Sequence, residues 1–224
     1  MKPEECWYLG VCPKSPGGCS NTCLRYIEML NLVQQSNIPE SKWIPLKLRP
    51  GKDRPAFIRL QEIKDDIENW TKSGGNLYIY SDTFGNGKTS WAIKLMLAYF
   101  NQVWAGNGFR RRGIFISVPE FMDRNREIIN NRDEEFVKMR EDLLKCDLVI
   151  WDDITSIKLT DFNHAVLLNY IDARVLSNKA NIFTGNVDYE GMVKNLGGRL
   201  ASRVWNGSEI VQFVDQDKRG VYYD

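Results

Sequence analysis

From residue 77 onward, the apolar positions fall into short continuous runs that are separated by longer segments with helical spacing. The runs cover residues 77–80, 113–118, 147–151, 181–184 and 209–214. The segments 88–101, 161–177 and 196–204, and one or two stretches within 119–145, carry apolar side chains at the period of a helix. Strands that alternate with helices are typical of a parallel sheet with helices on both faces. We therefore expect an α/β fold with five parallel strands.

The chain before this pattern divides into two parts. Residues 1–36 form a cysteine-, Pro- and Gly-rich segment that ends in a helix over 22–35, with Leu24, Ile27, Leu30 and Val33 on one face. Residues 37–56 contain four prolines and no regular periodicity, which is typical of a connector, and a helix is expected over 56–72. We predict a cysteine-rich module at 1–36, a linker with a lead-in helix at 37–73, and the main domain at 74–224.

The charge balance identifies no partner by itself. The 224 residues include 30 basic and 29 acidic side chains, so a nucleic-acid surface would have to be a local patch. No apolar run reaches the roughly 18 residues of a membrane span. The first five residues, Met-Lys-Pro-Glu-Glu, lack the apolar stretch of a secretory signal. We expect a cytoplasmic protein with no membrane partner.

Residues 81–89 form a glycine-rich segment between the first strand and the next helix, and read Ser-Asp-Thr-Phe-Gly-Asn-Gly-Lys-Thr. Small residues let backbone N–H groups wrap around a phosphate, at a helix N-terminus whose dipole favours anions. In such a loop the lysine, here Lys88, pairs with the β- and γ-phosphates, and the hydroxyl of Thr89 holds magnesium. We interpret Ser81 as standing where the usual pattern has its first glycine.

The alternative interpretation of this segment is a chance Gly-Lys-Thr turn. Strand, loop and helix nevertheless follow one another in the order that a phosphate-binding loop requires. The segment therefore predicts binding of ATP with Mg²⁺. The residues expected to contact the nucleotide are Thr83, Phe84, Gly85, Asn86, Gly87, Lys88, Thr89 and Ser90.

An acidic pair, Asp152 and Asp153, follows the buried strand at 147–151. Hydrolysis of ATP requires an acid at the end of a neighbouring strand, aimed at the magnesium ion. We expect Asp152 to hold the metal through water and Asp153 to polarise the attacking water. The alternative is a helix N-terminal cap after a buried strand. Many motor ATPases have Glu at the second position, so the shorter Asp153, together with Ser81, predicts slow turnover.

From about residue 74 to the end, the order of these elements resembles the ATPase domain of the DnaC-type helicase loaders, which are AAA+ relatives of the replication initiators. The IstB-type transposition helpers share the pattern. Three further segments carry the resemblance: Asn-Ile-Phe-Thr-Gly-Asn at 181–186, Leu-Gly-Gly-Arg-Leu-Ala-Ser-Arg at 196–203, and Val-Gln-Phe-Val-Asp-Gln-Asp-Lys-Arg at 211–219. The resemblance implies a P-loop NTPase core of the AAA+ type.

The same resemblance implies roles for individual residues. Asn186, with Thr184 as the runner-up, matches a sensor that touches the γ-phosphate. Arg203, with Arg199 as its companion, matches an arginine finger that reaches the ATP of the next subunit, and Arg219 matches a second sensor. A finger supplied in trans makes hydrolysis wait for assembly, so an ATP-dependent homo-oligomer is expected. The alternative for the two arginines on the segment 196–203 is one exposed, hydrated helix face.

Four of the five cysteines, Cys6, Cys12, Cys19 and Cys23, lie in the first 23 residues. In a reducing cytosol such a cluster more often binds a metal than forms disulfides, and four thiolates on Zn²⁺ are expected. An iron–sulfur cluster or four unrelated thiols are the alternatives. Some DnaC-type loaders of Gram-positive bacteria resemble this chain in having an N-terminal zinc module that grips the replicative helicase. If the module is a partner surface here, Trp7 and Tyr8 are expected to be exposed and to contribute.

A surface for single-stranded DNA is expected, by the same resemblance, on the helices after the second strand. Basic and aromatic side chains there suit a single-strand groove: Phe121, Arg124, Arg126, Arg132 and Lys138. Acidic residues are interspersed among them, so a solvated amphipathic helix is an equal alternative. Residues 110–112 are a denser basic run, Arg-Arg-Arg, for which a charged turn is the alternative.

Three functions are compatible with these features. The first is an ATP-dependent loader, encoded by a phage or another mobile element, that delivers a replicative DNA helicase to single-stranded DNA. The second is an IstB-like transposition helper that acts on DNA. The third is a metabolic P-loop kinase, which the paired aspartates and the Leu-Gly-x-Arg-x-x-x-Arg box suit poorly. The first is the expectation carried forward.

Overall fold

The computed structural model describes residues 6–8, 12, 22–43, 48–103, 110–128, 133–156 and 160–216. Within them, five parallel strands form one sheet in the order β2-β3-β4-β1-β5. The strands are β1 (Asn76–Tyr80), β2 (Gly113–Ser117), β3 (Leu148–Asp152), β4 (Ala180–Gly185) and β5 (Glu209–Gln212). The predicted α/β fold with a five-stranded parallel sheet is confirmed, and each strand lies within about two residues of its predicted bounds.

Helices connect these strands and precede them. They are α1 (Leu24–Gln35), α2 (Arg54–Asp65), α3 (Ile67–Lys72), α4 (Lys88–Gln102), α5 (Val118–Glu127), α6 (Glu134–Lys145), α7 (Asp161–Leu176), α8 (Tyr189–Leu196) and α9 (Gly198–Trp205). Two short 3₁₀ turns, η2 (Glu40–Lys42) and η3 (Gly51–Asp53), lie in the connector between α1 and α2.

Two predicted helices differ from the observed ones. The lead-in helix expected over 56–72 is two helices, because Asp66 leaves the helical conformation with φ −116° and ψ 30°. The last helix begins at Gly198 because Gly197 has a φ of +77°. The additional helix α8 precedes it and is capped at its N-terminus by the Asp188 carboxylate, which accepts the Gly191 N–H at 3.0 Å.

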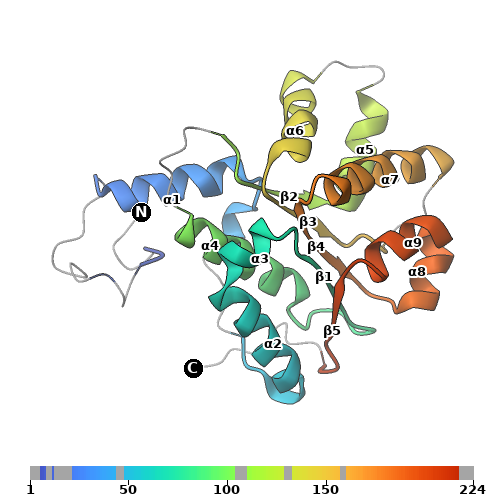
Figure 1. Ribbon diagram of the computed structural model, residues 1–224, viewed down its shortest axis with the longest axis horizontal. Coiled ribbons are helices and arrows are strands. Elements are labelled where there is room, and N and C mark those ends of the chain that lie inside the picture. The colour runs from blue at the N-terminus through green and yellow to red at the C-terminus, as the bar shows by residue number, and fades with distance from the viewer. Residues whose placement is uncertain are drawn as a thin grey trace.

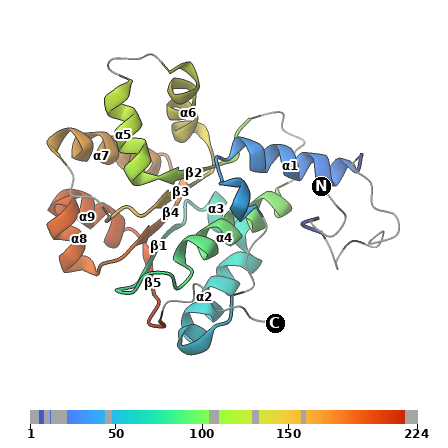
Figure 2. The ribbon, with the colours of Figure 1, turned by 180° about the vertical axis from the view of Figure 1, so that it is seen from behind.

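The sheet is the middle layer of three (Figures 1 and 2). Along β1, Leu77 and Ile79 point into a core that they share with α1, α2 and α4, whereas Tyr78 and Tyr80 point into a second core with α5 to α9. The side chains of all four are buried. A strand buried on both faces is apolar without alternation, which explains why the strands were recognisable as continuous runs.

The helix α1 belongs to the first of these cores. Its buried side chains Met29, Leu32 and Val33 belong to the same cluster as residues of α4 and the sheet. Just after α1, the carbonyl oxygen of Ser36 accepts the backbone N–H of Phe115 at 2.7 Å. Since β2 is an outer strand of the sheet, this hydrogen bond covers part of its edge.

The two aromatic residues near the N-terminus are packed against this region. Tyr8 is only 6% exposed, and the Arg25 guanidinium lies 3.8 Å from its ring centroid. Half-buried Trp7 stacks on Tyr26, and its indole N–H donates to the Trp43 carbonyl at 2.8 Å. The expectation that Tyr8 is an exposed contact residue is therefore wrong, because its ring is used for packing.

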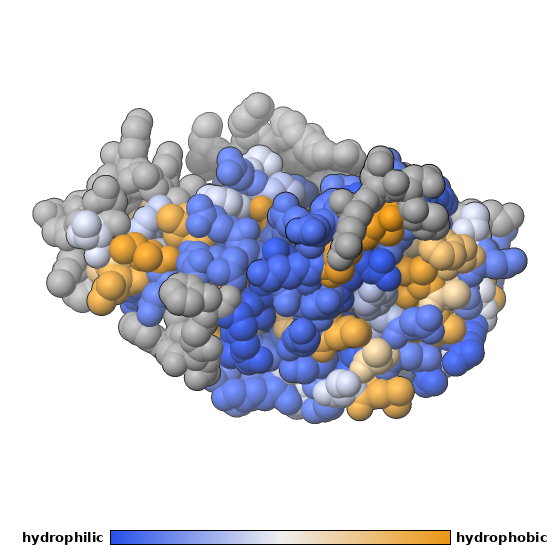
Figure 3. Space-filling model, turned by 90° about the horizontal axis from the view of Figure 1, so that it is seen from above, coloured by the Kyte–Doolittle hydropathy of each residue, from blue (hydrophilic) through white to orange (hydrophobic). Residues whose placement is uncertain are grey.

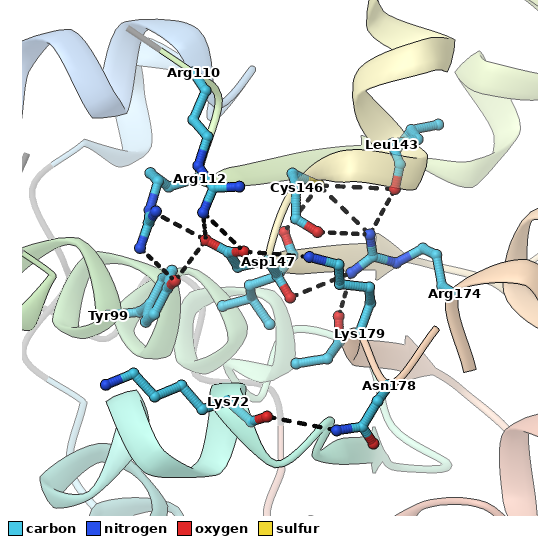
Figure 4. Close-up of polar contacts among 12 residues, drawn as sticks. Lys72, Tyr99, Arg110, Arg112, Leu143, Cys146, Asp147, Arg174, Asn178 and Lys179 are labelled. Carbon is cyan, nitrogen blue, oxygen red and sulfur yellow. Dashed lines mark hydrogen bonds and ion pairs between the residues drawn. The ribbon is translucent and has the colours of Figure 1, made fainter. Parts of the chain in front are cut away.

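A buried arginine ties together the N-terminal ends of two strands and the end of α6 (Figure 4). The guanidinium of Arg174, on α7, donates to the carbonyls of Leu143 and Ala180 and to the Asn181 side chain. The Arg174 side chain has no exposed surface, and burial lowers its pKa. Backbone carbonyls therefore replace a carboxylate as its partners.

The face seen in Figure 3 is mainly hydrophilic, and its apolar side chains lie in small separate patches. None of the helices that the described residues form is long and apolar enough to cross a membrane.

Candidate nucleotide-binding site

The glycine-rich loop joins β1 to α4, and two of its glycines have backbone conformations that favour glycine. Gly85 has a φ of +72° and Gly87 a φ of +101°. A Cβ atom on Gly87 would also lie 2.9 Å from the Leu48 Cδ1 atom, so the connector packs directly on the loop. The helix begins at Lys88 and leaves its first N–H groups facing the loop. This is the arrangement of an anion-binding site at a helix N-terminus.

The position of the first glycine needs correction. The pattern Gly-x-x-x-x-Gly-Lys, counted back from Lys88, places its first glycine at Asp82 and not at Ser81. Asp82 is exposed and does not have a positive φ, so the loop here does not require a glycine at that position. Ser81 is instead the residue before the pattern, and it is buried.

Ser81 is the centre of a hydrogen-bond network inside the loop. Its hydroxyl oxygen accepts the Thr83 N–H at 3.1 Å and the side-chain amide of Asn86. The same amide reaches the Thr83 hydroxyl at 3.2 Å. Asn86 is fully buried, so its side chain braces the loop from within. Asn86 was predicted only to contact the nucleotide, and its neighbours in sequence give no sign of this bracing role.

The ammonium group of Lys88 lies inside the loop. It donates to the Thr83 carbonyl at 3.0 Å and to the Asn86 side-chain oxygen at 3.3 Å. A buried ammonium requires such acceptors, and phosphate oxygens would be stronger ones. The loop conformation, the buried lysine and the hydroxyl of Thr89 together form a set of donors that fits a nucleoside triphosphate.

Asp152, at the end of β3, faces the first turn of α4. Its Oδ1 atom accepts the hydroxyl of Thr89 at 2.8 Å and the hydroxyl of Thr184 at 2.7 Å. Burial raises the pKa of Asp152, while the two hydroxyl hydrogen bonds act in the opposite direction. A carboxylate and a threonine oxygen side by side are hard oxygen ligands of the kind that Mg²⁺ prefers. Thr89 and Asp152, which were both predicted to serve magnesium, are thus in direct contact, and their role in metal binding stays a prediction.

Asp153 is one of three described non-glycine residues with a positive φ, at +55°. Its N–H donates to the Thr184 hydroxyl oxygen at 2.9 Å, which holds this backbone conformation in place. Backbone conformations of this kind cost of order 1–3 kcal/mol and concentrate at functional sites. The role of Asp153 in polarising water stays a prediction.

The predicted sensor residues lie at the end of β4. Thr184 is fully buried and links Asp152 to Asp153, so its hydroxyl is already used within the protein. Asn186 follows the strand; its N–H donates to the Thr155 hydroxyl at 3.0 Å, and its side chain is half-buried. Of the two candidates, Asn186 has the side chain that is available for a ligand.

The two finger candidates lie on α9 and share one partner on α7. Arg203 Nε lies 2.7 Å from Asp172 Oδ1, and Arg199 Nη2 lies 3.5 Å from Asp172 Oδ2. Both arginine side chains are more than half exposed. The exposure fits the alternative of one exposed helix face, although both side chains pair with Asp172, and the finger role of Arg203 stays a prediction. Arg219, the second-sensor candidate, lies outside the described residues.

The zinc prediction finds no support in the described part of the chain. Cys6 and Cys12 are half-buried and pack against the apolar core, whereas Cys23 is exposed. No group of three or more His, Cys, Asp or Glu side chains among the described residues could hold a metal ion. Cys19 lies outside them, so the four-thiolate site stays a prediction.

The expected DNA-contacting side chains have mixed environments. Phe121 is 2% exposed and packs against Phe136, so the expectation that it stacks on a base is wrong. Arg124 pairs with Asp133 and Arg126 with Asp123, whereas Lys138 is exposed and Arg132 lies outside the described residues. The three arginines at 110–112 form ion pairs with Asp142 and Asp147, as a structural charged turn would.

A cavity of about 360 Å³ opens beside Asp152, at the edge of the sheet. Its walls come from the connector, the end of β2, and the helices α5 and α6. The charged groups that line it are Lys42, Glu120, Arg124 and Asp152. The connector thus contributes a cation to the surroundings of the candidate metal carboxylate, where the positive charge of Lys42 opposes the rise in the pKa of Asp152.

Comparison with known proteins gives the fold a precedent. No family model and no curated protein sequence matches the chain. The structure is similar to the DnaC helicase loader, with a TM-score of 0.65 and 17% identity, over 78% of this chain and 99% of that one. It is similar to DnaI with a TM-score of 0.60 and 17% identity, over 79% of this chain and 95% of that one.

AMPPCP-bound DnaA from Aquifex aeolicus is similar with a TM-score of 0.57 and 18% identity, over 71% of this chain and 46% of that one. These similarities show the P-loop AAA+ fold. At such low identities they establish the fold alone.

Proposed function

We propose that this protein is an ATPase of the AAA+ type that loads a replicative DNA helicase onto single-stranded DNA. The observation that carries the proposal is the contact between the Thr89 hydroxyl and the Asp152 carboxylate, which joins the phosphate loop after β1 to the end of β3. The similarity to the DnaC helicase loader supports the loading function, since it spans nearly the whole of that chain.

Each part of the site has a distinct task in this proposal. The loop amides, the positive end of α4 and Lys88 bind and orient the phosphates. The Thr89 hydroxyl donates a hydrogen bond to Asp152, so the lone pairs of its oxygen are free to bind a metal ion. A bound Mg²⁺ ion would supply a divalent charge to neutralise the charge that develops on the phosphates. Asp153 orients the attacking water, and Asn186 faces the γ-phosphate position.

Hydrolysis in this proposal depends on a second copy of the chain. Arg203 supplies the cation that stabilises the transition state in a neighbouring subunit, with Arg199 as its companion. An arginine finger of this kind raises the rate of hydrolysis by a factor of about 10³–10⁵. ATP therefore acts chiefly as an assembly signal, and hydrolysis promotes release. The shorter acid Asp153 favours slow turnover.

The proposed partners are the helicase and single-stranded DNA. The cavity beside Asp152 is flanked by Lys42 and Arg124, and Lys138 is exposed on the adjoining helix. Cations placed around the end of β2 suit a phosphate backbone. In this position, bound DNA would lie next to the candidate metal carboxylate, and this gives a physical route for DNA to influence hydrolysis.

The proposal is tested by complex formation between the purified protein and the replicative helicase of its host. We expect a stoichiometric complex by size-exclusion chromatography with light scattering when ATP is present. The matched variant Lys88→Ala should weaken the complex at least about tenfold, because it loses the phosphate contact. A protein that instead forms a complex with a transposase, or transfers phosphate to a small molecule without DNA or protein partners, contradicts the proposal.

A further inference from the structure

Asp172 lies at the meeting point of two arginines that come from one face of α9. Arg203 approaches Oδ1 through Nε at 2.7 Å, and Arg199 approaches Oδ2 through Nη2 at 3.5 Å. The Asp172 side chain is 20% exposed, compared with 52% for Arg203 and 70% for Arg199. The carboxylate is therefore the fixed member of the cluster, and the arginines are the members that reach into solvent.

The atom through which Arg203 pairs determines what its other atoms are able to do. Nε is the inner nitrogen of the guanidinium group, so an ion pair at Nε leaves the N–H groups of the outer Nη1 and Nη2 atoms able to donate to another group. No other polar contact of the Arg203 side chain is found in the described part of the chain. A planar guanidinium held at Nε keeps a pair of parallel donors for an anion such as phosphate.

The charge balance of the cluster also leaves room for an anion. One carboxylate and two guanidinium groups have a net charge of +1, so the ion pairs do not neutralise both arginines. The carboxylate belongs to α7, whose neighbouring residue Ile171 has no exposed surface. Asp172 therefore stands on a rigid support and restricts the rotamers of an otherwise flexible side chain, which reduces the entropy lost when Arg203 binds.

We infer that Asp172 is a positioning residue that orients Arg203 for insertion into the nucleotide site of a neighbouring copy of this chain. This role rests on the proposed function, in which Arg203 is the arginine finger, and it assigns to Asp172 the orientation of that side chain. As a mere brace between α7 and α9, the exposed ion pairs would contribute little to stability. A positioning role requires instead that the loss of Asp172 affects the subunit that donates the finger.

Mixing two inactive variants tests this requirement. Lys88→Ala cannot bind the nucleotide phosphates but still donates Arg203, whereas Arg203→Ala binds nucleotide and lacks the finger. An equimolar mixture should recover ATPase activity above either variant alone. Asp172→Asn is then placed in the Lys88→Ala chain or in the Arg203→Ala chain. We expect the first placement to lower the recovered rate by on the order of tenfold to a hundredfold, as a misplaced catalytic group does.

The second placement should also be measured as a factor by which the recovered rate falls. This factor should be at least about fivefold smaller than the factor for the first placement. Asp172→Glu in the donor chain should recover part of the rate, because a carboxylate is retained. Asp161→Asn, which changes an exposed carboxylate in the first turn of the same helix, is the matched control and should have the same effect in either chain. Thermal unfolding of every chain checks that the two placements of Asp172→Asn are equally folded.

The outcomes separate this inference from the function on which it rests. If the mixture recovers activity and Asp172→Asn acts equally in both chains, or in neither, Asp172 is not a positioning residue. In that case Arg203 is still supported as a finger in trans. If wild-type protein hydrolyses ATP but the mixture does not recover activity, Arg203 is not a finger in trans, and both ideas fall. If wild-type protein hydrolyses no ATP with helicase and DNA present, the proposed function itself is wrong.

Discussion

The hydroxyl group of Thr184 donates to Asp152 Oδ1 at 2.7 Å and accepts the N–H of Asp153 at 2.9 Å. One buried side chain on β4 therefore fixes both the carboxylate that would face magnesium and the backbone of the residue that would orient water. Because Thr184 has no exposed surface, no solvent molecule can replace these two bonds without a rearrangement of the strand end.

Thr184→Val should lower both stability and ATPase activity. Valine has the same shape but leaves the Asp153 N–H without its partner and the Asp152 carboxylate with the Thr89 hydroxyl in place of two hydroxyl partners, at about 1–3 kcal/mol of unfolding free energy. Urea unfolding measures the change in stability, and phosphate release measures the ATPase activity. Thr184→Ser, which keeps the hydroxyl, should lie closer to wild type in both measurements. A valine variant that matches wild type, with a loss only in Thr184→Ser, would show that the methyl group matters and the hydroxyl does not.

Asp152→Asn should lower ATPase activity by at least about tenfold, that is, by more than about 1.4 kcal/mol in transition-state stabilisation. It should also raise the melting temperature at neutral pH. Burial raises the pKa of Asp152 above its ordinary value, so the folded state is favoured by protonation of this group and loses stability as pH rises through the folded pKa. Asparagine accepts the same two hydroxyl bonds and carries no charge.

The pH dependence of this difference is the sharper measurement. The melting temperature of Asp152→Asn relative to wild type should be highest above the folded pKa and should shrink as pH falls below it. Calorimetry from pH 4 to 8 at fixed ionic strength measures this difference. A constant difference across the range would mean that the titration of Asp152 does not contribute to stability.

Ser81 and Asn86 should act as one unit in nucleotide binding. Each alanine variant removes the same cross-loop hydrogen bond, so the double variant should be less damaging than the sum of the single changes. We expect a coupling energy of about 0.5–3 kcal/mol in the binding free energy of a fluorescent ATP analogue. Additive effects would indicate that the two side chains brace the loop independently.

Arg174→Met should be the most destabilising of these changes. It removes donors from the carbonyls of Leu143 and Ala180 and leaves them buried, at a loss of roughly 3–5 kcal/mol in unfolding free energy. Arg174→Lys should recover little of this loss, because an ammonium group cannot reach both carbonyls and Asn181 at once. Urea unfolding of the three proteins tests this order. A lysine variant as stable as wild type would contradict the role of the Arg174 guanidinium in joining these carbonyls.

Much of the fold was predictable because its strands are apolar on both faces and its phosphate loop is a local pattern. The lead-in helix was predicted as one, since the local break at Asp66 leaves no mark on the apolar period. The short α8 was missed because most of its side chains are polar or exposed, and only Met192 and Leu196 are buried. The burial of Tyr8 was not predictable either, because its segment has no periodicity from which to assign a face.

The candidate site was predictable only where residues adjacent in sequence carry the chemistry. Lys88, Thr89 and Asp152 belong to such local patterns. The hydroxyl link through Thr184 and the pairing of Asp172 with Arg203 join segments that are 32 and 31 positions apart, and only the packing of α7, α9 and the strands brings them together. Such contacts have no local signal in the order of residues.

The hydrogen bond from Phe115 to Ser36 has a consequence for any shortened form of the protein. A fragment that starts at residue 74 would lack α1 and the connector, so it would present the outer side of β2 and part of the apolar face of α4 to solvent. An open strand edge beside apolar surface is a template for pairing with another chain. Such a fragment should therefore self-associate through β2, and the residues before the sheet serve as its protection against aggregation.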